Sequence, residues 1–336
     1  MLDISTLNKI DKQGMHKIYD DWPQMALDAY NIKPKSRNYK NIDHIVFSGM
    51  GGSGAIGDLF SAILSKTSIH VTLVKGYVLP RTVDSNTLVV TVSVSGNTVE
   101  TLTVLKSAKK LGCKVIAFSS GGKMESMCKK NNIDFQKINM IHSPRASFII
   151  YVYSILKTLE SIMPIKKHDI LQSIFDLTEI SKQINSSNLT KNNTSLSIAT
   201  WLRGIPLIYY PWGLQAIAVR FKSSLQENAK SHAIIEDVIE ASHNGIVSWE
   251  RPSTIQPVLL RGQNDYVKTK QRWAILKEYF NKNKIDYMEI NSPKGSILTK
   301  LVCLIYVLDY ASVYYAIMNK IDPSPVKSIS FIKKRL

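Results

Sequence analysis

Residues 87–102 read TLVVTVSVSGNTVETL, which has the form of a strand, a short polar loop and the start of a helix. The run Leu88 to Val92 is apolar and rich in β-branched residues, as is typical of a strand covered on both faces of a parallel sheet. The loop after it holds Ser93, Ser95 and Thr98. Because open α/β sheets bind ligands at the carboxyl ends of their strands, this stretch predicts an α/β domain with a polar site at the sheet edge.

The same alternation of strand and helix extends in both directions. The runs that predict strands lie at residues 43–49, 70–77, 113–120, 206–213, 255–262 and 285–290. Helical patterns lie at residues 56–64, 99–111, 124–130, 147–162, 169–184, before Asn228, at 267–280 and from 297. The polar, Asn/Ser-rich segment 186–195 is typical of a linker. We therefore predict two α/β domains, 1–185 and 196–336, each a parallel sheet flanked by helices in a three-layer αβα sandwich.

The charge of the chain favours anionic partners. Its 336 residues suit two cores, and 43 Lys and Arg against 26 Asp and Glu give a formal charge of +17. Phosphorylated substrates and nucleic acids both fit such a charge. The basic residues are spread along the chain without a zinc-finger or RNP-like motif, so we expect a small phosphorylated ligand and no nucleic acid.

Cysteine usage and the first residues bear on the compartment. No CxxC pair occurs, and the N-terminal residues 1–13 show no apolar export signal, so a reducing, cytoplasmic setting without a structural metal is expected. The cysteines, interpreted as inert buried thiols, are Cys113, Cys128 and Cys303. Residues 297–318 are long and apolar, but Lys300 and Asp309 would be costly in a bilayer. A buried amphipathic helix is predicted there, and no membrane partner.

A glycine-rich turn, SGMGGSGAIGDL at residues 48–59, lies between a predicted strand and a helix. Glycines permit close backbone approach, and helix N-terminal amides favour anions. A dinucleotide fingerprint competes with this interpretation, but no acidic residue ends the strand at 70–77 to hold a ribose. The Walker lysine is absent too. A plain tight turn remains the alternative for this segment alone.

The hydroxyl cluster after residue 92 is the more specific signal. Ser93, Ser95 and Thr98 precede a predicted helix N-terminus, where the helix dipole favours a phosphate. An ordinary cap by Asn97 or Thr98 would explain one polar residue and leave the others unexplained. Phosphate binding is therefore the preferred interpretation.

These motifs together resemble a known module. GMGGS at residues 49–53 followed by SxSGNTxET from Ser93 resembles the sugar-isomerase (SIS) domain, which binds phosphosugars. RFKSSLQENAKSH (220–232), ASHNGIVSW (241–249) and the C-terminal segment from Leu308 resemble the archaeal-type bifunctional phosphoglucose/phosphomannose isomerase family over most of the chain. The resemblance implies reversible conversion of glucose 6-phosphate or mannose 6-phosphate to fructose 6-phosphate through a cis-enediol(ate), without metal or cofactor.

The resemblance also implies residue roles, and each suits the chemistry. Proton transfer between C1 and C2 needs a carboxylate, which matches Glu227, and ring opening near neutral pH suits His243. In the family this histidine can come from the neighbouring subunit, which implies a homodimer. Arg145, in a turn after the fourth predicted strand, would stabilise enediolate charge, and Lys333, beside Lys334 and Arg335, would contact the sugar ring. The implied phosphate-binding positions are Gly52, Ser53, Ser93, Ser95 and Thr98.

Two alternatives stay open. A non-catalytic SIS regulator would bind phosphosugars without converting them, although no helix-turn-helix pattern occurs in the first forty residues. An amino-sugar phosphate isomerase would keep the chemistry and change the substrate. No Cys nucleophile follows Met1 to release ammonia from glutamine, which disfavours it.

Overall fold

The computed structural model describes residues 2–35 and 39–335. Contacts divide the chain into two compact units. Unit 1 consists of Met1–Asp20 and Leu171–Pro325, and unit 2 of Asp21–Ile170 and Val326–Leu336. These ranges differ from the sequence-based 1–185 and 196–336, because the N-terminal helices pack on a helix near the C-terminus. Each unit has a parallel sheet with helices, so the α/β prediction is confirmed.

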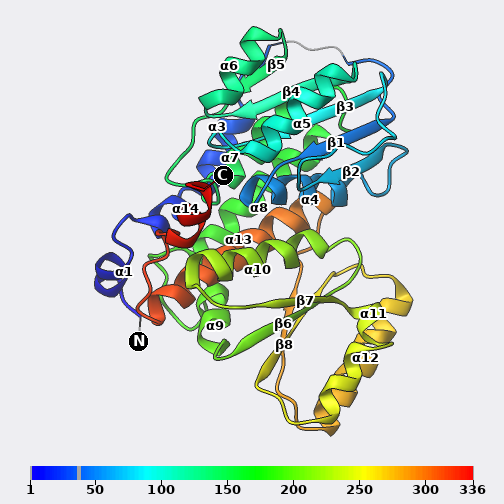
Figure 1. Cartoon of the computed structure of the whole chain (residues 1–336). Helices are drawn as coiled ribbons and strands as arrows, with labels where there is room; N and C mark the ends of the chain where they lie inside the picture. Colours follow the sequence, from blue (N-terminus) through cyan, green and yellow to red (C-terminus); the bar gives the residue numbers. More distant parts are fainter. Residues whose placement is uncertain (1, 36–38, 336) are drawn as a thin grey trace. The chain divides into compact units, whose positions relative to one another are not determined.

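Unit 2 is a helix–sheet–helix sandwich (Figure 1). Its described parallel strands, in spatial order, are β2 (His70–Val74), β1 (His44–Ser48), β3 (Thr87–Val92), β4 (Lys114–Ser119) and β5 (Asp134–Lys137). Its helices are α3 (Trp22–Tyr30), α4 (Gly52–Leu64), α5 (Val99–Lys110), α6 (Gly122–Lys130), α7 (Phe148–Thr158) and α14 (Lys327–Lys333). The chain runs outward from β1 to β2 and then from β3 to β5, so the sheet reverses its winding between β1 and β3.

Alternate side chains of each strand serve opposite faces of the unit 2 sheet. Val46 and Val89 pair in register and pack in one cluster with Leu105 of α5 and Met124 of α6. On the other face, the ring of Phe47 stacks on Phe60 of α4, 5.2 Å away. All residues of β1 and β3 are buried, which agrees with strands covered on both sides.

Unit 1 has a second parallel sheet. Its described strands, in spatial order, are β7 (Ile234–Asp237), β6 (Ile205–Tyr210), β8 (Ile255–Arg261) and β9 (Met288–Asn291). Its helices are α1 (Ile4–Ile10), α2 (Met15–Asp20), α9 (Thr194–Trp201), α10 (Gln215–Ala229), α11 (Val238–Ala241), the 3₁₀-helix η1 (Gly245–Glu250), α12 (Val267–Lys282) and α13 (Ile297–Met318), while α8 (Lys167–Ile184) runs from unit 2 into unit 1. Here the winding reverses between β6 and β8.

Helix α13 is the core helix of unit 1. It is long and apolar enough to cross a membrane, but 83% of its most apolar window is buried within the structure. It packs against α9, α10 and α2. The helix begins and ends where the sequence predicts, yet it is buried on nearly every side instead of on one face. Its buried Asp309 is satisfied by Arg220 of α10, whose Nη2 donates to Oδ2 at 2.6 Å.

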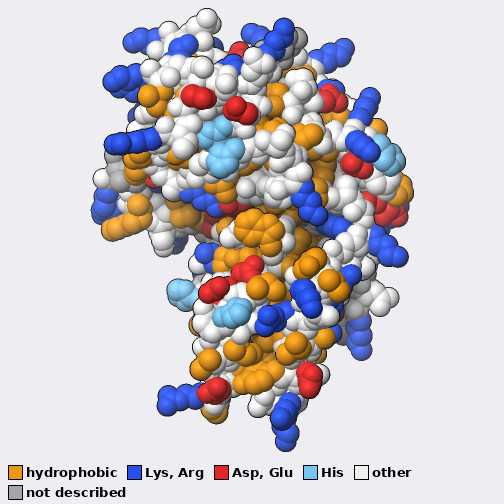
Figure 2. All heavy atoms as spheres, turned by 90° about the vertical axis from the view of Figure 1, so that its right-hand side faces the viewer, with side chains coloured by type: hydrophobic (Ala, Val, Ile, Leu, Met, Phe, Trp, Pro, Cys, Tyr) orange, Lys and Arg blue, Asp and Glu red, His pale blue; other side chains and the backbone are white. Residues whose placement is uncertain are grey.

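The cysteines are buried, and basic side chains are spread over the face shown in Figure 2. Cys113, Cys128 and Cys303 are all buried, as predicted, and burial raises the pKa of Cys128 to about 11. On the face shown in Figure 2, Lys and Arg side chains are scattered among neutral and acidic ones. Among the described residues, no group of three or more His, Cys, Asp and Glu side chains could hold a metal ion.

Candidate active site

The loops that follow β1 and β3 meet at the carboxyl edge of the unit 2 sheet, where its winding reverses. This position is where open α/β sheets bind ligands. The backbone N–H of Val94 donates to Ser53 Oγ at 3.3 Å, which joins the two loops. A Cβ added to Gly49 would lie 2.9 Å from the Ser53 carbonyl and 3.0 Å from that of Val92, so a larger residue would push the loops apart.

The hydroxyl cluster occupies the second of these loops. Ser93 Oγ and Thr98 Oγ1 are 2.9 Å apart and share a hydrogen bond, while Ser95 Oγ accepts from the backbone N–H of Asn97 at 3.3 Å. Ser93 is closed to solvent, whereas Ser95 and Thr98 are half-buried. In this arrangement Ser93 orients Thr98, and the two half-buried hydroxyls are the ones that an incoming ligand can reach.

The helices after β1 and β3 begin without a capping side chain. Their N-cap residues are Gly51 and Thr98, and among the described residues no side chain at these two positions accepts a hydrogen bond from the helix. The first turn of the helix after β4 is instead occupied from within, because Asn97 Oδ1 accepts the N–H of Lys123 and the Gly96 carbonyl accepts that of Met124. The first backbone N–H groups of a helix have no partner within it, and the positive end of the dipole lies there. The N-termini of α4 and α5 therefore leave donors for an anion at one sheet edge. We call these loops, 48–54, 93–98 and 119–122, the phosphate cradle.

Close backbone packing fixes the cradle. Gly96 has a φ of +69°, and a Cβ placed there would lie 1.8 Å from the carbonyl oxygen of Gly121. Asn97 Oδ1 accepts from the backbone N–H of Lys123 at 3.1 Å, and Ser120 Oγ donates to the Val94 carbonyl at 2.7 Å. The loops after β3 and β4 thus form one rigid surface.

Arg145 lies in the turn before α7, and it is 97% buried. The turn follows β5, the fifth strand of the sheet. Only four strands were predicted before it, because the short β5 was not recognised from the sequence. A Cβ on Gly52 would lie 3.4 Å from the Arg145 backbone, so the glycine lets the first cradle loop approach this turn. The structure therefore brings the backbone of Arg145 next to Gly52, at the start of α4 within unit 2.

Ser48 is a candidate that the sequence reasoning missed. It ends β1 and is buried, and its Oγ finds no hydrogen-bond partner in the described part of the chain. A buried hydroxyl without a partner is uncommon in native structures and often marks a functional site. Its place, directly before the glycine turn, was the signal that could have identified it.

Glu227 and His243 belong to unit 1, at opposite edges of its sheet. Helix α10 runs back from the carboxyl end of β6 to the amino end of β7, and the path from Gln215 to the half-buried Glu227 covers roughly 18 Å of helix. His243 comes after β7 and α11, and is exposed. The chain just beyond it, at Gly245, lies against Glu236 near the carboxyl end of β7. Topology therefore separates the two side chains within one subunit.

Lys333 is the last residue of α14, in the part of the C-terminus assigned to unit 2. Its side chain is exposed, and within the described residues no hydrogen bond or ion pair connects it to the cradle. The neighbouring Arg335 instead lies over the ring of Phe331, 3.5 Å from its centroid. Lys333 therefore stands at an exposed helix end, and its contact with the sugar ring stays a prediction.

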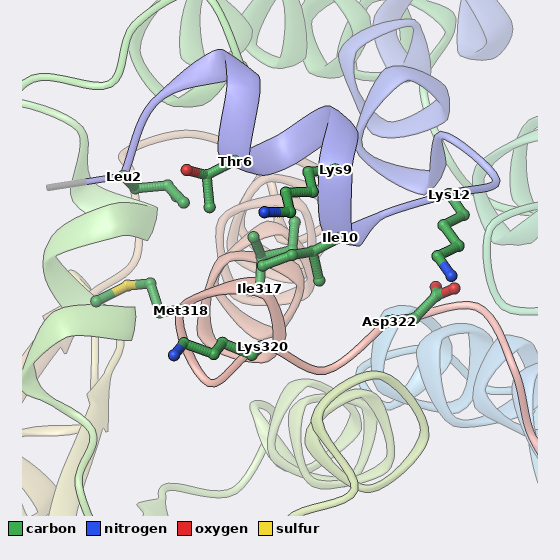
Figure 3. A pocket seen from close by; sticks show the side chains of 9 residues that line it. All are labelled: Leu2, Thr6, Lys9, Ile10, Lys12, Ile317, Met318, Lys320 and Asp322. Atoms are coloured by element: carbon green, nitrogen blue, oxygen red, sulfur yellow. The ribbon is translucent and has the colours of Figure 1, made fainter.

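A groove without any of these residues lies elsewhere. It has a volume of about 740 Å³ and lies in unit 1 between α1 and the end of α13 (Figure 3). Apolar side chains such as Ile10 and Ile317 line it together with Lys9 and Lys320. None of the predicted catalytic or phosphate-binding residues, all of which are described, is among its lining residues.

Comparison with known proteins decides the family. The profile of the SIS domain matches residues 38–163, and that of the bacterial phospho-glucose isomerase C-terminal SIS domain matches residues 191–336. A bifunctional phosphoglucose/phosphomannose isomerase of Caldicellulosiruptor bescii is 35% identical, and the alignment covers 94% of this chain and 96% of that one. The chain belongs to the bifunctional phosphoglucose/phosphomannose isomerase family. As a member of this family it is an isomerase that acts on phosphosugars.

Two further similarities bear on the fold and on the substrate. A glucose-6-phosphate isomerase like protein of Thermus thermophilus shares the fold, with a TM-score of 0.64, 15% identity and 99% of each chain covered. A D-glucosamine-6-phosphate 4-epimerase of Sulfolobus acidocaldarius is 28% identical, over 96% of this chain and 97% of that one. Relatives of the bifunctional isomerases thus include a protein named for a different sugar phosphate.

Proposed function

We propose that this isomerase interconverts glucose 6-phosphate and mannose 6-phosphate with fructose 6-phosphate. The observation that carries the proposal is the phosphate cradle, in which two helices, α4 and α5, begin without a capping side chain around accessible hydroxyls. Such N-termini bind phosphate through backbone N–H groups and the helix dipole. The similarity to the bifunctional relatives supports the choice of hexose.

The proposed chemistry passes through a cis-enediol(ate). The Glu227 carboxylate removes the proton from C2 of the open-chain aldose and returns a proton to C1, while a proton leaves the C2 hydroxyl and one is added to O1. Glucose and mannose differ only at C2, so both give the same enediol(ate). Because their C2 protons lie on opposite faces of it, one base serves both substrates when the C1–C2 part of one of them is turned about the C2–C3 bond. The Arg145 guanidinium would stabilise the negative charge that develops on oxygen.

His243 is proposed to open the sugar ring from the neighbouring subunit of a homodimer. The topology of unit 1 supports this, since Glu227 and His243 lie at opposite edges of its sheet. His243 is exposed, and the apolar side chains of Ile239 and Val247 close to it in sequence are also exposed, by 37% and 57%. Exposed apolar side chains around a functional residue are typical of a surface that another subunit covers.

The base is tested by Glu227→Gln, which keeps the shape and removes the proton acceptor. We expect kcat to fall about 10²- to 10⁴-fold for both hexose phosphates in coupled assays. The control is Glu278→Gln, an exposed carboxylate of α12, which should leave kcat unchanged. In D2O, wild-type turnover should place deuterium on C1 of fructose 6-phosphate. Deuterium on C1 supports proton transfer through the carboxylate, while transfer of the original C2 proton without exchange is also open to a single base. A fully active Glu227→Gln variant contradicts the mechanism.

The dimer is tested by mixing two inactive variants, Glu227→Gln and His243→Ala. If the histidine acts across the interface, a mixed dimer has one intact site out of two, and random assortment restores roughly a quarter of wild-type activity. If both residues act within one subunit, mixing restores none.

Glucosamine 6-phosphate, assayed in parallel, tests the amino-sugar alternative that the epimerase relative suggests. Tight binding of phosphosugars without any turnover would favour a non-catalytic regulator.

A further inference from the structure

Lys230 ends α10 in an unusual conformation. It has φ 55° and ψ 29°, in the left-handed region, and its N–H donates to the carbonyl of Leu225. Helices usually place Gly or Asn at such a position, because a Cβ is unfavourable there. Lys284 and Lys320 share this conformation, so the role of Lys230 is to be sought in the contacts of its side chain.

The Lys230 ammonium joins two segments of unit 1. Its Nζ lies 2.8 Å from the carbonyl oxygen of Glu227 and 3.1 Å from that of Asn228, both at the end of α10. It also donates to the carbonyls of Asp322, at 3.1 Å, and Pro323, at 3.2 Å, in the turn after α13. A cation is favoured at the negative end of a helix, and here it also binds that end to a neighbouring turn.

The rest of α10 is held on α13 by a buried polar stripe. Arg220, Ser224 and Asn228 lie four residues apart, on one side of the helix. Ser224 Oγ donates to Asp309 at 2.5 Å, as Arg220 does, and Asn228 Nδ2 donates to Ser312 Oγ at 2.8 Å. Glu227 therefore has a fixed turn before it, and Lys230 fixes the turn after it.

The charge of Glu227 also acts on Arg220 of this polar stripe. Burial alone would lower the pKa of Arg220, but Asp309, and with a smaller contribution Glu227, hold it above its ordinary value. The guanidinium thus stays charged. The last turn of a helix is where fraying begins, because its final carbonyls have no partners within the helix. The ammonium of Lys230 occupies these carbonyls in α10.

We infer that Lys230 is a positioning residue for Glu227, an inference that rests on the proposed role of Glu227 as the base. By donating to the Glu227 carbonyl and to the carbonyls of the Asp322–Pro323 turn, Lys230 fixes the backbone from which the carboxylate reaches the substrate. A small displacement of a reacting group lowers the rate strongly, so loss of these hydrogen bonds lowers kcat. Because the phosphate cradle is built from other residues, KM stays near its wild-type value.

Lys230→Asn tests the inference, because Asn tolerates the left-handed conformation and lacks the ammonium. We expect kcat for glucose 6-phosphate to fall about tenfold, with KM changed less than twofold. Lys230→Arg keeps a cation at the same backbone position and should recover part of kcat. It also keeps the test decisive if Lys230→Asn folds poorly, since a folded Lys230→Arg with kcat as low as Glu227→Gln would overturn the inference.

The matched control is Lys320→Asn. Lys320 is also left-handed, with φ 58°, directly after α13, and its side chain lines the groove of Figure 3. Within the described residues, no hydrogen bond or ion pair of its Nζ is found. Equal kcat in the two Asn variants, or a lower Tm of Lys230→Asn with wild-type kcat, overturns the positioning role. Activity in Glu227→Gln would instead refute the proposed base, so the two failures are distinguishable.

Discussion

The two sheets reverse their winding in the same way, yet their reversal points differ in chemistry. In both units the helices at this point, α4 and α5 in unit 2 and α10 and α12 in unit 1, begin without a side chain at the N-cap that accepts a hydrogen bond from the described helix. What differs is the loops, which in unit 2 are rich in glycines and hydroxyls. In unit 1 the loop after β8 contains Asp265, whose carboxylate accepts the Gly262 N–H at 3.1 Å and the Trp273 Nε1–H at 2.9 Å. The loop after β6 carries Trp212, 81% exposed, where unit 2 has its glycine turn.

The comparison shows that the fold provides a place for a ligand, and the loops decide whether an anion can use it. The neighbouring β7 edge of unit 1 is also acidic, since Asp237 caps α11 through the N–H groups of Ile239 and Glu240. Carboxylates in unit 1 thus occupy the N–H groups at the start of α11 and the N–H of Gly262, and their negative charge disfavours an anion nearby. The cradle loops of unit 2, at residues 48–54, 93–98 and 119–122, contain no carboxylate.

Gly96→Ala is the change that should break the unit 2 cradle most strongly. The new Cβ would meet the Gly121 carbonyl at 1.8 Å in a left-handed backbone, so we expect a loss of about 3–5 kcal/mol in the free energy of unfolding. Gly112→Ala is the control, because its φ of +76° is similar but nothing lies within 4 Å. There we expect about 1–2 kcal/mol from backbone strain alone. Urea unfolding of both variants measures the difference, and equal losses would contradict the close packing of the cradle.

Thr98→Val sharpens the contrast between the two edges. It removes an accessible hydroxyl, and because hydrogen bonds to charged groups contribute about 1.5–3 kcal/mol, KM for hexose phosphates should rise about tenfold or more. Inorganic phosphate should inhibit the variant less than wild type. The matched control is Ser292→Ala, a buried hydroxyl just after β9 in unit 1. An equal rise of KM in the control would show that the edges do not differ as described.

Asp265→Asn has the smallest expected effect and tests the internal carboxylate of unit 1. Burial raises the pKa of Asp265 above its ordinary 3.8, although bonds from Trp273 and Gly262 oppose the shift. A raised pKa in the folded state means that the folded protein binds this proton more tightly than the unfolded chain. The stability it contributes is therefore complete below pH 3.8 and is lost as pH rises through the folded pKa.

The difference in unfolding free energy between Asp265→Asn and wild type isolates this group. We expect it to shift in favour of the variant, by about 1 kcal/mol or less, as the pH rises from 3.5 to 6.5. Urea unfolding across that range measures it. A difference that does not vary with pH would show that the carboxyl ionises as freely in the folded protein as in the unfolded chain.

The sequence predicted the long and strongly patterned elements well. The apolar runs of β1, β3 and β8 and the helix α13 were all found where expected. The strands β5 and β7 were not predicted, because each is a four-residue edge strand that carries charged residues and exposes part of its surface. Such strands form because a neighbouring strand offers hydrogen bonds, which no local pattern reveals.

Local motifs gave the position of the proposed phosphate-binding residues, while their role stays a prediction. Ser93, Ser95 and Thr98 lie in the loop after β3, and Gly52 and Ser53 lie in the first turn of α4, at the same sheet edge. The burial of the Ser48 hydroxyl without a partner among the described residues, and the hydrogen bond of Lys230 to Asp322, both depend on tertiary structure. They could therefore not be predicted from the sequence. Glu227 and His243 lie at opposite edges of the sheet because α10 runs back to the amino end of β7, and the sequence motifs alone do not give that direction.

The discontinuity of unit 1 has a consequence for how the chain is made. Helix α2 leaves the ribosome early, yet its partners Tyr306 and Tyr310, which donate to the Tyr19 carbonyl and to Asp20, follow some 290 residues later. At 5–20 residues per second, the N-terminal segment waits roughly 15–60 s for them. Most of unit 2 is synthesised during that interval and can fold first. Helix α2 is thus a part of the nascent chain that a chaperone, or a competing copy of the protein, would meet unpaired.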